Sequence, residues 1–170
     1  MQRKYSLWIV PTGKTESQLQ NLINQLADNY KAPKFIPHVT IGGIKVSDEE
    51  LADVKAKVNE LAGYSAFTIQ LTEYGYKDEN HRCLYRLATS EQLDIIFQKA
   101  TELFPKARIE HFRNMPHVSI MYGDYSADVK KRIIEKLPAS DMSFEFDGIS
   151  LCLADGTEED WRIVYKAAIP

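Results

Sequence analysis

A short segment that pairs a histidine with a hydroxyl occurs twice in this chain. Residues 37–41 read PHVTI, residues 116–120 read PHVSI, and each is followed within a few residues by glycine. Side chains two positions apart lie on the same face of a strand, so each segment would present its histidine and its hydroxyl together. The candidate site residues are therefore His38, Thr40, His117 and Ser119.

Two imidazoles and two hydroxyls around one site suit proton transfer at a phosphate. Imidazole titrates near neutral pH, so one histidine can accept a proton from water while the other donates a proton to a leaving oxygen. The hydroxyls can donate hydrogen bonds to the non-bridging phosphate oxygens and stabilise the charge that builds there. The substrate that fits is a strained cyclic phosphodiester, which water opens to a phosphomonoester. This scheme uses no metal ion and no other cofactor, and we expect neither.

The second copy of the segment is the main reason to assign these residues a catalytic role. A single His-x-Thr segment on a strand is usually explained by core packing. The same pattern occurring twice, in the same apolar frame with proline before it and glycine after it, is much harder to explain that way.

The hydrophobic pattern predicts the elements that must position these segments. Short apolar runs predict strands, and apolar residues at helical spacing predict helices. The expected strands are 5–10, 34–44, 67–76, 84–89, 117–122, 144–153 and 161–168. The expected helices are 15–30, 47–61, 90–104 and 126–137. Ser47 and Ser126 are the residue types that favour helix starts.

The order of these elements around the two segments indicates an internal duplication. The segments lie about half a chain length apart, and similar runs of helices and strands surround each one. We therefore predict an α+β fold, a bilobal duplicated unit with two antiparallel-rich sheets facing a central cleft and helices outside. Residues 1–170 would form a single domain of this kind, with the two segments face to face across the cleft.

The composition limits the partners. With 44% hydrophobic and 26% charged residues and a net charge of −3, the chain is ordinary for a globular protein and suggests no broad basic surface for duplex nucleic acid. Its N-terminal apolar run is too short for a signal peptide, and no apolar stretch approaches membrane-spanning length. We expect a cytoplasmic monomer that binds a small nucleotide and no membrane.

At the level of motifs, the chain resembles the 2H phosphoesterase superfamily, which takes its name from paired H-x-[ST] segments. Within it, the details are most similar to the cyclic phosphodiesterase branch, and the resemblance covers essentially the whole chain. The segments that carry it are YSLWIVP, FIPHVTIGG, MPHVSIMYG and FDGISLCLADGTEEDWRIVYKAAIP.

The resemblance implies a bilobal fold and metal-independent opening of cyclic phosphates. Implied substrates are ADP-ribose 1″,2″-cyclic phosphate, opened to ADP-ribose 1″-phosphate after tRNA splicing, and nucleoside 2′,3′-cyclic phosphates, opened to 2′-phosphates. By position, His38 and His117 match the catalytic histidines, and Thr40 and Ser119 match the phosphate-binding hydroxyls. The sequence does not assign which histidine is the base and which is the acid.

Two aromatic residues are further candidates, because they match positions near the site in this family. Trp8 could stack on a base or pack against a ribose, and Tyr122 could lend a hydroxyl to the phosphate. Tyr122 lies three positions after Ser119, so an ideal strand would turn it to the opposite face, and a bend or bulge near Gly123 would be needed to change this. Arginines that could meet a distal pyrophosphate are Arg82, Arg86 and Arg113.

Three other interpretations stay open from the sequence. The chain could be an RNA-end 2′,3′-cyclic phosphodiesterase or a 2′-5′ RNA ligase-like enzyme, which would want a basic track for RNA 3′ ends. A binding module that senses nucleotides without turnover is a second alternative, although it has no need of two titrating groups. A metal site built from His38, His117 and a carboxylate is the third, and a chelator would separate it from the leading interpretation.

Overall fold

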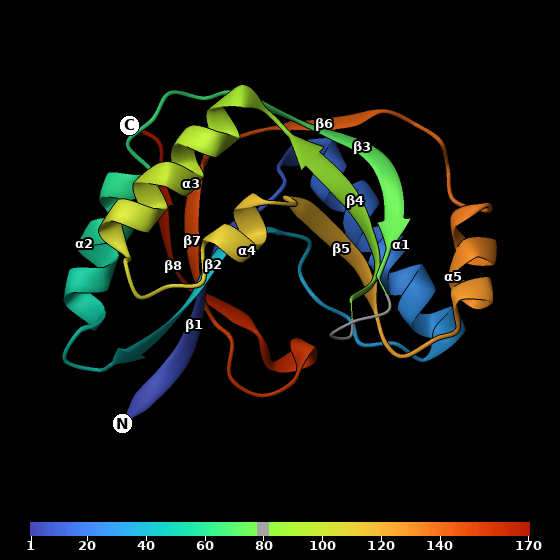
Figure 1. Cartoon of the computed structure of the whole chain (residues 1–170), viewed down its shortest axis with the longest axis horizontal. Coiled ribbons are helices and arrows are strands. Elements are labelled where there is room, and N and C mark those ends of the chain that lie inside the picture. Colours follow the sequence, from blue (N-terminus) through green and yellow to red (C-terminus); the bar gives the residue numbers. More distant parts are fainter. Residues whose placement is uncertain (78–81) are drawn as a thin grey trace.

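The eight strands found among the described residues form one antiparallel sheet in the order β6-β3-β4-β5-β2-β1-β7-β8. The structure is a computed structural model and describes residues 1–77 and 82–170 (Figure 1). The strands are β1 (Gln2–Ile9), β2 (Val39–Ser47), β3 (Thr68–Tyr76), β4 (Arg82–Thr89), β5 (His117–Tyr122), β6 (Met142–Glu145), β7 (Gly148–Leu153) and β8 (Arg162–Ala168). The helices are α1 (Gly13–Tyr30), α2 (Leu51–Leu61), α3 (Glu91–Leu103), α4 (Glu110–Arg113), α5 (Ala127–Ile134) and the 3-10 turn η1 (Glu158–Asp160).

The expected α+β class and antiparallel pairing are confirmed, and the expected pair of sheets is corrected to two halves of one sheet. The halves meet where β2 pairs with β5 at Val39 and Val118. Pairing satisfies backbone groups that each strand would otherwise expose at a sheet edge. The two segments that carry the histidines are therefore neighbours in the sheet, and they do not face each other from separate sheets.

The order of the elements supports the predicted duplication. Strands from each half of the chain also pair with strands from the other half. The series β1-α1-β2-α2-β3 is followed by β4-α3-α4-β5-α5 and the last three strands. In each series the first strand pairs with the histidine-bearing strand, while β3 pairs with β4 and β7 pairs with β1, across the two series. Figure 1 shows α2 and α3 together on one side and α1 and α5 on the other.

The strand expected over 144–153 is wrong, because the chain crosses there from one end of the sheet to the other. β6 pairs with β3, whereas β7 pairs with β1 and β8. Gly148 begins β7 with a φ of 142°, and a side chain there would clash with the carbonyl oxygen of Ala167. Glycine is the residue that tolerates such a φ, so the apolar run is broken at this position.

Three local boundaries also differ from expectation or refine it. Ser47 ends β2 and does not cap a helix; its N–H and hydroxyl donate to the Glu50 carboxylate, and α2 begins only at Leu51. The segment expected as a loop before the second histidine contains the short helix α4. Ser126 does cap α5, as expected, by accepting a hydrogen bond from the N–H of Val129.

The hydrophobic core runs along the face of the sheet that Val39 and Val118 share. Both valines are fully buried, as are Leu7, Ile41 and Ile120 on the same three central strands.

Among the described residues, no helix is long and apolar enough to cross a membrane.

A buried arginine holds an irregular part of this sheet. β3 carries an extra residue between Leu71 and Tyr74 relative to β4. Arg86, only 3% exposed, donates hydrogen bonds to the carbonyls of Leu71, Thr72 and Ser140, at 3.2, 3.0 and 2.8 Å, and lies over the Tyr74 ring. The guanidinium thus satisfies carbonyls that the bulge removes from the regular ladder.

Arg86→Met should lower the free energy of unfolding by about 2 kcal/mol or more, because three buried or half-buried carbonyls lose their donor. Urea unfolding of the variant measures this loss. Arg132→Met, at an exposed position of α5, is the matched control and should change stability by less than about 0.5 kcal/mol. Equal effects of the two variants would contradict this role of Arg86.

Candidate functional site

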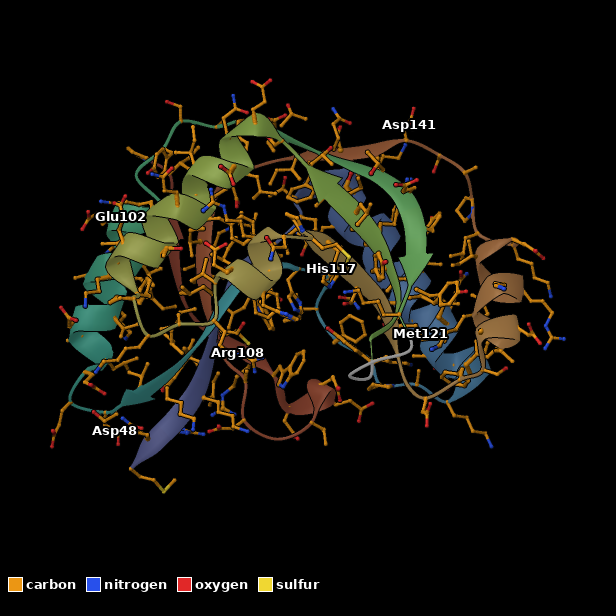
Figure 2. The ribbon with its side chains drawn as sticks, in the orientation of Figure 1. Asp48, Glu102, Arg108, His117, Met121 and Asp141 are labelled. Carbon is orange, nitrogen blue, oxygen red and sulfur yellow. The ribbon has the colours of Figure 1, made fainter. Side chains whose placement is uncertain are left out.

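The backbone pairing of β2 with β5 brings the four candidate residues to one face of the sheet. Val39 and Val118 are direct partners. In an antiparallel pair, one step along each strand places His38 across from Ser119 and Thr40 across from His117. All four then lie on the face opposite to the valines. Each histidine therefore lies beside the hydroxyl of the other segment, and Figure 2 shows His117 near the centre of the molecule.

Both histidine-bearing strands contain a bulge at the same place. Ile41 is an extra residue in β2, because Leu7 pairs with Gly42 and Trp8 pairs with Thr40. Ile120 is the equivalent extra residue in β5, because Leu84 pairs with Met121 and Tyr85 with Ser119. A bulge shifts the alternation of side chains after it.

The bulge in β5 explains the orientation of Tyr122. Ile120 and Met121 are both buried, so two consecutive side chains face the core and the next one returns to the site face. Tyr122 accordingly lines the same cavity as His117. The bend that the sequence suggested near Gly123 is thus found earlier, at Ile120.

The same backbone contact orients both histidines. Nδ1 of His38 lies 2.6 Å from the carbonyl oxygen of Ile36, and Nδ1 of His117 lies 2.8 Å from that of Met115. A carbonyl oxygen only accepts hydrogen bonds, so Nδ1 carries the proton in both rings. Proton exchange with a bound molecule would then go through Nε2 of each histidine.

An aromatic ring from the neighbouring strand lies against each histidine. Trp8 stacks on His38 with ring centroids 3.7 Å apart and planes within 10°, and Tyr85 lies 5.2 Å from His117 at 55°. The indole N–H of Trp8 donates to the hydroxyl of Ser6 at 2.8 Å, which fixes the ring. Trp8 is 1% exposed, so its stacking face is occupied by His38; its role as a substrate contact stays a prediction.

His38 is held in its neutral form. Burial lowers the pKa of His38 from 6.5 to about 4; the hydrogen bond with the Ile36 carbonyl opposes this shift, and the nearby His117 adds to it. A buried imidazole loses the hydration that stabilises its charged form. Near neutral pH, His38 can therefore accept a proton at Nε2.

A cavity of about 290 Å³ opens beside these residues. Of the sequence candidates, His38, Thr40, His117, Trp8 and Tyr122 line it. Ser119 is 5% exposed and lies on the same face, beside Tyr85, but is not part of the lining.

The lining also contains residues that the sequence analysis missed. They are Ser6, Phe112, Ala154, Glu158 and Trp161. Glu158 and Trp161 come from the segment that joins the expected strands 144–153 and 161–168, to which the sequence assigns no function. A signal was present in Thr157 and Asp160, which form a capping box around η1: the N–H and hydroxyl of Thr157 both donate to the Asp160 carboxylate.

The arginine candidates do not reach this cavity where the structure describes their side chains. Arg86 donates to backbone carbonyls on the other face of the sheet, and Arg113 pairs with Asp94 and Glu110. The side chain of Arg82 lies outside the described residues.

A metal site would need several ligand side chains close together within the residues that the structure describes. No group of three or more histidine, cysteine, aspartate or glutamate side chains there is arranged to hold a metal ion.

Comparison with known proteins gives both a family and a fold. The family model described as the 2′-5′ RNA ligase superfamily matches residues 13–158. A protein of Arabidopsis thaliana named cyclic phosphodiesterase is 27% identical over an alignment of 180 positions. The alignment covers 94% of this chain and 92% of that protein.

Solved structures share the fold at low sequence identity. TT0787 of Thermus thermophilus superposes with a TM-score of 0.68 at 13% identity, covering 98% of this chain and 97% of that one. LigT of E. coli complexed with phosphate has a TM-score of 0.63 at 12% identity, and LigT complexed with 3′-AMP has 0.60 at 17%; each match covers 99% of this chain and 98% of LigT.

The depressed pKa of His38 should make folding stability depend on pH. Between about pH 6.5 and 4, the unfolded chain binds a proton at this residue that the folded chain does not, so the free energy of unfolding decreases as pH falls through that window. His38→Gln should remove up to about 3 kcal/mol of this decrease. Urea unfolding at pH 7 and pH 4 measures it.

The exposed His111 on α4 supplies the control for this experiment. His111→Gln should keep the pH dependence of the wild type. If His38→Gln keeps the same pH dependence as well, His38 is not the buried neutral imidazole described above.

Proposed function

The chain belongs to the 2′-5′ RNA ligase superfamily, and from that premise we propose that it hydrolyses cyclic phosphodiesters with its two histidines. Membership agrees with the family resemblance found in the two H-x-[ST] segments, and it supports an enzyme of the phosphoric diester hydrolase class. The relative in Arabidopsis thaliana named cyclic phosphodiesterase supports the same reaction class.

One observation carries the proposal: each histidine lies across the β2–β5 pair from the hydroxyl of the other segment. A phosphate bound on this face, over the two strands, would meet one imidazole from each strand and a hydroxyl beside each imidazole. This arrangement allows proton removal and proton donation on opposite sides of one phosphorus atom, which an in-line displacement requires.

The burial of His38 favours it as the general base. Its neutral Nε2 would take a proton from water as the water oxygen attacks phosphorus. His117 in its protonated form would give a proton to the ribose oxygen that leaves, and the ring opens to a monoester. Thr40 and Ser119 would donate hydrogen bonds to the non-bridging oxygens, where negative charge grows.

The substrates proposed are the small cyclic phosphates that the resemblance implies. They are nucleoside 2′,3′-cyclic phosphates, opened to 2′-phosphates, and ADP-ribose 1″,2″-cyclic phosphate, opened to ADP-ribose 1″-phosphate. A fold neighbour, LigT of E. coli, has been crystallised with 3′-AMP and with ATP, which supports a small nucleotide as the ligand.

His38→Gln and His117→Gln should each lower kcat by roughly a hundredfold or more, because each removes one proton-transfer partner. Thr40→Ala and Ser119→Ala should lower kcat/KM by a smaller factor, roughly tenfold. Phosphorus NMR of adenosine 2′,3′-cyclic phosphate follows appearance of the monoester. His111→Gln is the matched histidine control, and turnover near the wild-type rate in either motif variant would refute the two-histidine mechanism.

Addition of EDTA should leave the wild-type rate unchanged, since no step of the scheme uses a metal ion. The same phosphorus NMR assay, before and after dialysis against the chelator, measures this. Loss of turnover that returns when a divalent cation is added would favour the metal-site alternative built on His38 and His117.

A further inference from the structure

The cavity wall away from the phosphate-binding strands has a chemistry of its own. Two aromatic side chains, Phe112 of α4 and Trp161 at the end of η1, border it together with the Glu158 carboxylate. None of the described lining side chains is a lysine or an arginine. We propose that Trp161, Phe112 and Glu158 form a nucleobase subsite, in which Glu158 selects bases that present hydrogen-bond donors, guanine above all. This proposal rests on the proposed function and names the substrate class of that same site.

Trp161 is the aromatic ring best placed to meet a base. It is half-exposed, whereas Trp8 is 1% exposed and covered on one face by His38. The centroid of the Trp161 ring lies 6.0–6.1 Å from those of Trp8, His38 and Tyr122, and the planes are tilted by 59–80°. None of these three rings is stacked parallel on Trp161. Stacking of a nucleobase on an aromatic side chain contributes binding energy for any of the four bases.

Glu158 supplies an acceptor in the same wall. It is half-exposed, and no hydrogen bond or ion pair in the described part of the chain uses its carboxylate. An unpaired carboxylate in a binding cavity favours ligands with N–H or O–H donors and disfavours ligands with negative charge. This wall is therefore unsuited to a diphosphate.

The loop that carries both residues is organised before any ligand binds. The capping box of Thr157 and Asp160 closes η1, with hydrogen bonds of 2.9 and 2.8 Å to the Asp160 carboxylate. The N–H of Lys34, from the segment before His38, donates to the Glu159 carboxylate at 3.4 Å. A preorganised wall loses less entropy when a ligand binds.

This chemistry discriminates between the two proposed substrates. In a nucleoside 2′,3′-cyclic phosphate, the ribose that holds the reacting phosphate also holds an uncharged, flat base. In ADP-ribose 1″,2″-cyclic phosphate, that ribose holds no base and continues through its 5″ oxygen into a diphosphate. Aromatic rings and a carboxylate suit the base, whereas a diphosphate would call for cations. Arg86 and Arg113 are engaged elsewhere.

The two oxygens of Glu158 also rank the bases. Guanine presents N1–H and an adjacent amino group, so it can donate two hydrogen bonds to one carboxylate. Adenine and cytosine each present one amino group beside an acceptor nitrogen. Uracil presents its N3–H between two carbonyl oxygens. These oxygens carry partial negative charge and are repelled by the carboxylate. A well-aligned bidentate contact discriminates between bases by roughly five- to a hundredfold.

The test is the kcat/KM for the four nucleoside 2′,3′-cyclic phosphates and for ADP-ribose 1″,2″-cyclic phosphate. We expect kcat/KM of the wild type to be roughly tenfold higher for the guanosine substrate than for the uridine substrate. We also expect kcat/KM to be lower for ADP-ribose 1″,2″-cyclic phosphate than for the guanosine substrate. Glu158→Gln should reduce the guanosine-to-uridine ratio by about the same factor. Glu49→Gln, at an exposed position outside the cavity lining, is the control and should leave the ratio unchanged.

A base-free substrate, methyl ribofuranoside 2,3-cyclic phosphate, separates this subsite from the reacting centre. Trp161→Ala and Glu158→Gln should each lower the ratio of kcat/KM for the guanosine substrate to kcat/KM for the base-free substrate, Trp161→Ala by roughly tenfold through loss of stacking. A wild type that opens none of these phosphates would refute the proposed function itself. Two results would overturn the nucleobase subsite alone. One is a wild type that opens all four nucleoside 2′,3′-cyclic phosphates with equal kcat/KM; the other is a Glu158→Gln variant with an unchanged ratio of kcat/KM for the guanosine and uridine substrates.

Discussion

The backbone pairing of β2 with β5 at Val39 and Val118 determines where the four candidate site residues lie. Because the strands are antiparallel, this one register fixes which histidine faces which hydroxyl, and because strands alternate their faces, it sends all four side chains to the face opposite the core. A slip by one residue would turn the imidazoles into the core and the valines into the cavity. The fully buried valines oppose such a slip, so hydrophobic packing on one face protects the chemistry on the other.

The internal duplication gives two similar half-sites, and their surroundings make them different. Each histidine carries its Nδ1 proton toward a backbone carbonyl, and each strand has its bulge after the hydroxyl residue. Trp8, however, lies parallel on His38, whereas Tyr85 lies tilted against His117. Burial keeps His38 neutral, which fits the role of proton acceptor proposed for it.

The sequence was sufficient to place the four candidate residues on one face of the sheet, but not to predict the residues that surround them. His38, Thr40, His117 and Ser119 could be assigned to one face because strand alternation is a local rule. Two other features could not be predicted: the bulge at Ile120 depends on pairing with β4, and the crossing at Gly148 depends on which distant strands β6 and β7 join. Glu158 and Trp161 reach the cavity from a loop whose position follows from the packing of the whole sheet. The capping box of Thr157 and Asp160 indicates an ordered turn there, but not that the turn borders the cavity.

The proposed two-histidine mechanism requires the two Nε2 atoms to bracket one phosphorus atom. A crystal structure with a guanosine 2′,3′-vanadate complex, which imitates the five-coordinate transition state, is the most direct measurement. Under this mechanism, vanadium lies between His38 and His117, with equatorial oxygens hydrogen-bonded to Thr40 and Ser119. Vanadium bound elsewhere, or bound with either imidazole turned away from it, would contradict the central claim.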